Sequence, residues 1–191
     1  MKKMGNTKIR VMVSIGMLSS IAYLLMLLNF PMPPFQSFLL VDFSDVPALI
    51  AALIFGPIAG ILVEFFKNLL DFVMTGSPTG VPVGHIANFL AGVLFILPTY
   101  YVYNKLNTKK GMTIGLITGT ATMSILMSIL NYYFILPAYT ALMGFPDLRS
   151  YVVAGILPFN IIKGIMISIL FMLLFIRMQN WINKLSVVKH V

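Results

Sequence analysis

Long apolar stretches recur along the whole chain and constrain its fold more than any other feature. They reach about 20 residues, the length that an α-helix needs to cross the hydrocarbon core of a bilayer. Of the 191 residues, 59% are hydrophobic and 9% are charged, whereas soluble domains carry about 25% charged residues. The sequence therefore predicts an all-α membrane protein, in which residues 1–191 form a single transmembrane domain with almost no soluble mass.

These apolar stretches predict six membrane spans. They lie at about 9–29, 46–55, 57–74, 82–104, 112–137 and 152–178. The second span is the weakest, because Gly56-Pro57 interrupts the run and proline breaks or kinks a helix. Residues 46–74 could instead form one kinked helix, so the apolar pattern alone leaves five spans and six spans both open.

The basic residues separate these two interpretations, because loops rich in lysine and arginine face the cytoplasm. Three basic clusters flank the spans: Lys2, Lys3, Lys8 and Arg10 before the first, Lys105, Lys109 and Lys110 after the fourth, and Arg177, Lys184 and Lys189 after the last. Only an even number of spans puts all three clusters on one side. We therefore expect six transmembrane helices in a compact bundle, with both termini cytoplasmic.

The segment between the first two spans, residues 30–44, is unusually apolar for a loop. Its prolines keep it from being helical, yet it also carries Phe35, Phe38 and Phe43. Such a loop would either fold back over the bundle as a lid or anchor in the membrane interface through its aromatic rings. The sequence does not separate these two interpretations. Ser44 or Asp45 is expected to cap the helix that follows.

Polar side chains inside the spans converge at one depth. Asn160 and Lys163 lie three residues apart, on one face of the outer half of the last span. No carboxylate on another span is within obvious reach of Lys163. Asn131 and Asn88 fall in the outer halves of their own spans. Convergent polar groups in an apolar bundle are typical of a ligand pocket, so these four residues are the candidate binding site. For either Asn88 or Asn131, interhelical hydrogen bonding that only holds the bundle together is the alternative.

Three charged residues share one face of the third span. Glu64, Lys67 and Asp71 are spaced at i, i+3 and i+7. One ammonium group with a carboxylate on each side is enough to explain them. The other interpretation is a relay for protons or cations. His85, at the start of the next span, could join Asp71 near the outer surface.

What the sequence lacks excludes several kinds of site. Without cysteine, the chain has no disulfide and no thiolate metal site. His85 and His190 are its only histidines, which argues against an intramembrane metalloenzyme. No phosphate-binding Gly-x-x-x-x-Gly-Lys-[Ser/Thr] motif occurs. Six helices with an outward pocket and no energy source suggest a binding subunit that other proteins power.

Five segments carry a family resemblance that covers nearly the whole chain: Leu40–Ile50, Phe55–Gly60, Glu64–Leu70, Gly84–Phe89 and Pro158–Gly164. They resemble the substrate-binding S component of energy-coupling factor (ECF) transporters, in particular the riboflavin-specific type. The resemblance implies a six-helix bundle in a bacterial plasma membrane that binds riboflavin near its outer face. It also implies a transmembrane coupling subunit and two ATPase subunits as partners. No cofactor is implied, because riboflavin is the transported ligand, and no enzymatic activity is implied.

The resemblance further implies that Asn131, Asn160 and Lys163 bind the flavin, in agreement with the depth argument. An isoalloxazine ring has apolar faces and an edge of alternating donors and acceptors. Asparagine can meet that edge with both kinds of group, and lysine can donate to its oxygens. Family members often carry an Ala-x-x-x-Ala docking pattern in helix one, and Gly16 and Ser20 stand at the matching positions here. Small side chains at this spacing let another helix approach closely.

Two other classes of function are weighed against this one. The first is a stand-alone, ion-coupled secondary carrier or facilitator for a small amphipathic solute, with Glu64, Lys67 and Asp71 coupling the ion. The second is an intramembrane enzyme, which the sequence disfavours because it shows no nucleophile–base pair. Flavin bound to the purified protein would favour the vitamin-binding function over the carrier.

Overall fold

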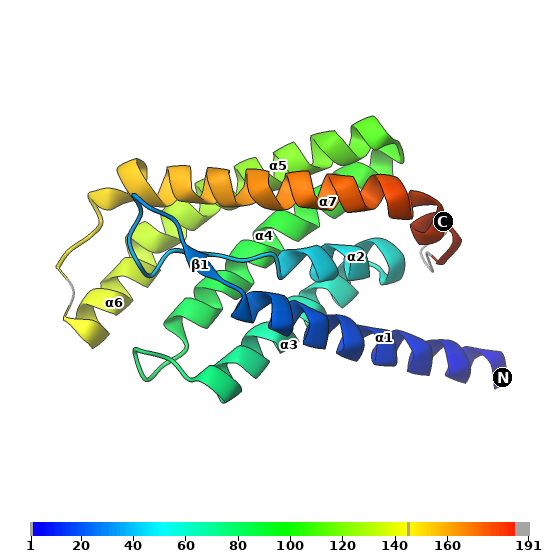
Figure 1. The fold of residues 1–191 in the computed structure, drawn as a ribbon, viewed down its shortest axis with the longest axis horizontal. Coiled ribbons are helices and arrows are strands. Elements are labelled where there is room, and N and C mark those ends of the chain that lie inside the picture. Colours follow the sequence, from blue (N-terminus) through cyan, green and yellow to red (C-terminus); the bar gives the residue numbers. More distant parts are fainter. Residues whose placement is uncertain (1, 145, 186–191) are drawn as a thin grey trace.

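Each of the six apolar stretches is helical in the computed structural model, which describes residues 2–144 and 146–185 (Figure 1). The α-helices are α1 (Lys2–Leu27), α2 (Asp45–Phe55), α3 (Pro57–Thr75), α4 (Val83–Leu106), α5 (Lys109–Leu130), α6 (Leu136–Met143) and α7 (Leu157–Leu185). Two π-helical segments, η1 (Asn131–Ile135) and η2 (Val152–Ile156), stand before α6 and α7. Each stretch overlaps a helix, although α1 begins before residue 9 and α7 continues past residue 178, and α5, η1 and α6 together cover the fifth stretch.

The break at Gly56-Pro57 gives two helices, as the six-helix interpretation requires. Gly56 has a φ of 99°, which side chains other than glycine rarely adopt, and Pro57 begins α3 at a position where its missing N–H costs nothing. Gly60 then allows close contact, because a Cβ atom there would lie 2.9 Å from that of Ala52. The two helices consequently form a tight antiparallel pair instead of one kinked rod.

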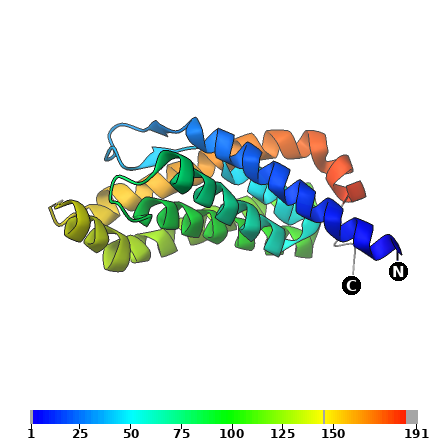
Figure 2. The same ribbon diagram turned by 90° about the horizontal axis from the view of Figure 1, so that it is seen from below.

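Helix α2 lies at the centre of the bundle. It contacts α1, α3, α4 and α7, and almost all of its residues are buried. Around it, α1 packs on α3, α3 on α4, α4 on α5, and α5 on α7. Figure 2 shows α1 crossing one face of the bundle, with the other helices beneath it. Charged residues on α2 or on the faces toward it are thereby removed from water.

Four helical stretches in the described chain are long and apolar enough to cross a membrane: Lys8–Leu27, Val83–Leu106, Lys109–Met143 and Val152–Gln179. Helix α3 has 19 residues but carries three charged ones. Helix α2 has 11 residues, or about 16 Å at 1.5 Å per residue, which is roughly half the thickness of a bilayer core. The number of complete crossings therefore stays a prediction.

The apolar loop between α1 and α2 folds back over the bundle. It starts and ends in a two-stranded antiparallel sheet, in which β1 (Phe30–Pro31) pairs with β2 (Leu40–Val41). Ring centroids of Phe35 and Phe159 lie 5.6 Å apart, and those of Phe38 and Tyr139 lie 5.5 Å apart. These contacts with α7 and α6 favour the fold-back interpretation over interfacial anchoring.

Both π-helical segments precede a proline at the same distance. The last residue of each π-helical segment begins an Ile-Leu-Pro tripeptide, which is residues 135–137 for η1 and residues 156–158 for η2. Proline has no N–H and its ring clashes with the carbonyl group four residues earlier, so a widened turn relieves both problems. The tripeptide is not sufficient, since Ile96-Leu97-Pro98 lies within regular α4. Neither π segment is anticipated by the apolar periodicity.

Candidate ligand-binding site

Asp42, at the end of β2, joins the loop to three helices. Its Oδ2 atom lies 3.3 Å from Nζ of Lys163 on α7 and 3.4 Å from Nδ2 of Asn88 on α4. Its Oδ1 atom accepts hydrogen bonds from the backbone N–H of Ser44, at 2.9 Å, and from the Ser44 hydroxyl. Residues separated by 121 positions in the chain are thereby joined around one buried carboxylate.

This arrangement keeps Asp42 ionised. Burial alone raises the pKa of its carboxyl group, but the ammonium groups of Lys163 and Lys67 and the hydrogen bonds from Ser44 outweigh burial, so that the pKa lies well below its ordinary value. Helical spacing could not reveal this partner of Lys163, because Asp42 lies in a loop and not on a span. The expectation that no carboxylate on another span lies within reach of Lys163 is not contradicted, because its partner belongs to the loop of residues 30–44.

A second group of buried charges lies between α2 and α3, next to Asp42. Nζ of Lys67 lies 2.5 Å from Oδ1 of Asp45 and 2.9 Å from Oε2 of Glu64, and donates to the Ser44 hydroxyl at 2.6 Å. Ser44 occupies the N-cap position of α2, but its side chain makes no capping hydrogen bond. It links Lys67 to Asp42 instead.

Asp71 takes no part in this group. Its Oδ2 atom lies 3.0 Å from Nε2 of His85, as the sequence suggested for that histidine, and Oδ1 accepts from Thr75 at 3.1 Å. The prediction that Lys67 is flanked by Glu64 and Asp71 is therefore half wrong. Lys67 turns away from the next turn of its own helix because Asp45, on the central helix α2, is nearer.

Asn131 and Asn160 leave an acceptor free. Both side chains are 5% exposed, and each donates its Nδ2 hydrogen bond, at 2.8 Å, to a carbonyl oxygen of its own helix. Within residues 2–144 and 146–185, their Oδ1 atoms accept no hydrogen bond. Asn131 is the first residue of η1, η1 contacts η2, and Asn160 follows η2 by four residues. π-Helical turns occur often at functional sites.

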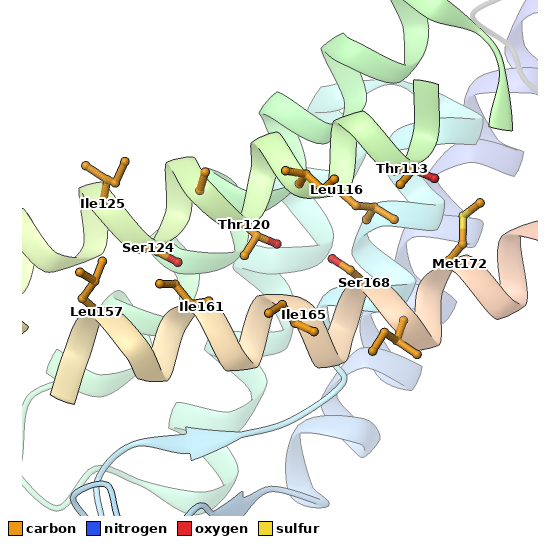
Figure 3. A pocket seen from close by; sticks show the side chains of 13 residues that line it. Thr113, Leu116, Thr120, Ser124, Ile125, Leu157, Ile161, Ile165, Ser168 and Met172 are labelled. Carbon is orange, nitrogen blue, oxygen red and sulfur yellow. The ribbon is translucent and has the colours of Figure 1, made fainter. Parts of the chain in front are cut away.

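A groove runs along α5 and α7, away from these residues. It encloses about 630 Å³, and Figure 3 shows its walls of Ile, Leu and Met side chains with the hydroxyls of Thr120, Ser124 and Ser168 between them. None of Asn88, Asn131, Asn160 and Lys163 lines it. The two helices lie close together at Gly164, where a Cβ atom would lie 2.6 Å from Cγ2 of Thr120. This groove is thus separate from the candidate binding site.

Comparison with known proteins decides the class of this bundle. Residues 10–175 match the family model described as "ECF transporter, substrate-specific component". This chain belongs to that family. It is a multi-pass membrane protein and a transport component, not an enzyme.

Named relatives of this S component cover most of its length. It is 56% identical over 182 residues to "Riboflavin transporter FmnP" of Bacillus subtilis (strain 168), covering 93% of this chain and 96% of that one. It is 43% identical over 188 residues to "Riboflavin transporter RibU" of Staphylococcus aureus (strain TCH60), covering 96% and 98%. A solved structure described as "Structure and mechanism of the S component of a bacterial ECF transporter" superposes with a TM-score of 0.80 at 44% identity, covering 92% of this chain and 99% of the other.

Proposed function

We propose that this chain binds riboflavin at the outer face of the membrane and takes it up as the S component of an ECF transporter. The names of the relatives at 56% and 43% identity support the ligand. The observation that carries the site is that Asn131 and Asn160 are each only 5% exposed, while their Oδ1 atoms accept no hydrogen bond in the described chain. A flavin edge would supply the missing donors.

Lys163 is the third proposed ligand-binding residue, and Asn88 the fourth. An ammonium group has three N–H donors, and the contact of Lys163 with Asp42 uses one of them at 3.3 Å. The remaining donors would reach the oxygens of a bound flavin. Asn88 would act from the other side of Asp42, through its 3.4 Å hydrogen bond to that carboxylate. The loop of residues 30–44 would close over the ligand.

Flavin titration tests this proposal. Wild-type protein should bring flavin with it on purification, visible by its absorbance and identified by mass spectrometry. Asn160→Leu should weaken riboflavin binding about ten- to hundredfold, since an unpaired buried polar group costs about 1–3 kcal/mol. Asn104→Leu is the matched control, because Asn104 is exposed on α4 and should leave affinity unchanged. Equal affinities in the two variants would remove Asn160 from the site.

We also propose that the chain crosses the membrane six times, with both termini in the cytoplasm. The beginning of α1, the end of α7 and the turn between α4 and α5 all lie at one end of the bundle, opposite the β1–β2 loop (Figure 1), and this supports an even count. Cysteine-accessibility labelling suits a chain without native cysteine. Labelling of Thr108→Cys from outside the cell would contradict this topology.

Docking to a separate coupling subunit is proposed to use Gly16 and Ser20. Both lie on an exposed face of α1, and a Cβ atom at Gly16 would have no neighbour within 4 Å. Gly16→Leu should therefore leave riboflavin affinity intact and abolish uptake in cells that contain the coupling subunit and its two ATPase subunits. A large loss of affinity in the purified variant would assign this face to the fold or the pocket instead.

The ion-coupled carrier is less well supported. Lys67 already lies 2.5 Å from Asp45 and 2.9 Å from Glu64, and Asp71 is paired with His85. A relay would need these groups to exchange partners across a well-packed interface. A stable structural cluster explains the same distances.

A further inference from the structure

The buried charges around α2 do not balance. Three carboxyl groups, those of Asp42, Asp45 and Glu64, meet two ammonium groups, those of Lys67 and Lys163. All five side chains are at most 4% exposed. An uncompensated charge away from water costs several kcal/mol, so a cluster with one surplus negative charge favours the uptake of a cation.

Hydrogen bonding shows the same imbalance independently. On α2 and α3, four buried side-chain oxygen atoms of the described residues have no hydrogen-bond partner: Oδ2 of Asp45, Oε1 and Oε2 of Glu64, and Oδ1 of Asn68. Oε2 of Glu64 has only its ion-pair contact with Lys67. Asn68 uses its own Nδ2 to donate to the carbonyl oxygen of Glu64 at 2.8 Å. The cluster thus has more acceptors than donors, and each missing hydrogen bond is costly.

Asp42 is the carboxyl group best supplied with donors, and Glu64 the one supplied worst. Asp42 receives hydrogen bonds from Ser44, Asn88 and Lys163, and Asp45 accepts one from Lys67 at 2.5 Å. Glu64 accepts none, although it is 0% exposed.

Among the side chains that the structure describes, the elements packed against α3 bring no further compensating charge to Glu64. Its carboxyl group lies against α4 at Gly92, where a Cβ atom would come within 2.2 Å of Oε2. On α4, His85 is paired with Asp71. On α1, which also contacts α3, Lys8 and Arg10 are exposed. The cation nearest to Glu64 is therefore Lys67, which Asp45 shares.

We propose that Glu64 is a proton-binding site, occupied at neutral pH, whose hydrogen atom supplies the missing donor to Oδ2 of Asp45 or Oδ1 of Asn68. This proton makes the cluster neutral, with two carboxylates against two ammonium groups. It goes beyond the proposed function, because it is present whether or not a ligand is bound. Its role is to let α2 pack on α3 and α4 inside the membrane without a counter-ion.

Glu64 is the only glutamate among the 191 residues, which permits a test on the unmodified chain. Cell-free synthesis with glutamate labelled with ¹³C at the side-chain carboxyl, followed by removal of any affinity tag, would label this group alone. At pH 7 the isotope-edited infrared spectrum should show the carbonyl stretch of a carboxylic acid, shifted by exchange into D₂O. A spectrum with only carboxylate stretches would overturn the proposal.

Two comparisons sharpen the result. Asp45→Asn leaves two carboxyl groups for two ammonium groups, so the labelled band should convert to the carboxylate form, whereas Asp71→Asn should leave it unchanged. An acid band that persists in Asp45→Asn would overturn the argument from charge balance. A carboxylate signal that requires sodium, and is absent in N-methylglucamine chloride, would overturn the proposal. It would show that a bound metal cation, and not a proton on Glu64, balances the charge of the cluster. If Asp45→Asn does not fold, the wild-type spectrum still decides.

Discussion

Lys67 and Lys163 are both buried lysines in an apolar bundle, but their surroundings differ. Lys67 is 0% exposed, and its Nζ atom has three partners within 2.9 Å, all on or next to helices α2 and α3. Lys163 is 4% exposed and has one partner at 3.3 Å, which belongs to a loop. An ammonium group has three donors. Lys67 donates two hydrogen bonds and lies in ion-pair contact with Glu64, and in this sense is saturated, whereas Lys163 donates one hydrogen bond. Burial of a lysine therefore does not by itself distinguish a structural ion pair from a binding group, and we expect the number and rigidity of its partners to do so.

Removing the saturated lysine should have the largest effect on the fold. Lys67→Met leaves Asp45 and Glu64 without their shared cation, and breaking a buried ion pair costs about 3–5 kcal/mol. We expect a loss of that size in the free energy of unfolding, measured by SDS titration of purified protein. Lys163→Met should lose clearly less, because Asp42 keeps its hydrogen bonds from Ser44 and Asn88. Equal losses in both variants would remove the distinction between the two lysines.

For ligand binding the order should reverse. Lys163→Met deprives a buried flavin oxygen of its donor, so riboflavin affinity should fall about ten- to hundredfold, equivalent to about 1–3 kcal/mol. Quenching of riboflavin fluorescence on titration measures this directly. Lys105→Met, which changes an exposed lysine at the far end of α4, is the matched control. Wild-type affinity in Lys163→Met would mean that its single contact with Asp42 is its whole role.

The bond between Asp42 and Lys163 can be isolated by a double-mutant cycle. If the sequence pattern alone is considered, Lys163→Met would hold or raise stability, because it removes an unpaired cation from lipid. The 3.3 Å contact changes that expectation, since the variant also deprives Asp42 of a cation. Asp42→Asn combined with Lys163→Met should be more stable than the sum of the two single changes, with a coupling energy of about 0.5–3 kcal/mol. Strict additivity would show that the contact contributes nothing.

Much of the fold could be predicted because bilayer thickness and apolar length are tied together. The helix limits and the break at Gly56-Pro57 follow from residues that are local in sequence. The site was predictable only in part. Asn131, Asn160 and Lys163 are visible as polar residues in apolar spans, and the structure finds all three buried. Their roles in binding stay a prediction.

The partners of these residues could not be predicted, for two physical reasons. Asp42 meets Lys163 across 121 positions, and the fold of the 30–44 loop, with its short β1–β2 sheet and its aromatic contacts, brings them together. Lys67 had two candidate carboxylates on its own helix, and helical spacing cannot show that Asp45 on α2 replaces Asp71. A long, flexible side chain pairs with the group that lies nearest in the folded structure, which spacing along one helix does not show. The surplus of carboxylates emerges only once these choices are known.

The ion pair of Asp147 and Arg149 extends the comparison to the surface, where the effect should be smallest. Nη2 of Arg149 lies 2.6 Å from Oδ2 of Asp147, but the two side chains are 49% and 55% exposed, and exposed pairs contribute little to stability.

Hydrogen bonds from Arg149 lower the pKa of Asp147 from 3.8 to about 2. A carboxyl group whose pKa is lowered in the folded state stabilises that state at pH values above its pKa in the unfolded chain. This contribution is lost as the pH falls through the pKa of the folded state. Arg149→Ala should therefore return the pKa of Asp147 toward 3.8. Carboxyl NMR of ¹³C-labelled aspartate measures this pKa, and the Asp147→Asn variant assigns the Asp147 signal. The melting temperature at pH 7 should not change measurably. A loss in the free energy of unfolding as large as that of Lys67→Met would show that short distance, and not burial, governs the strength of ion pairs in this protein.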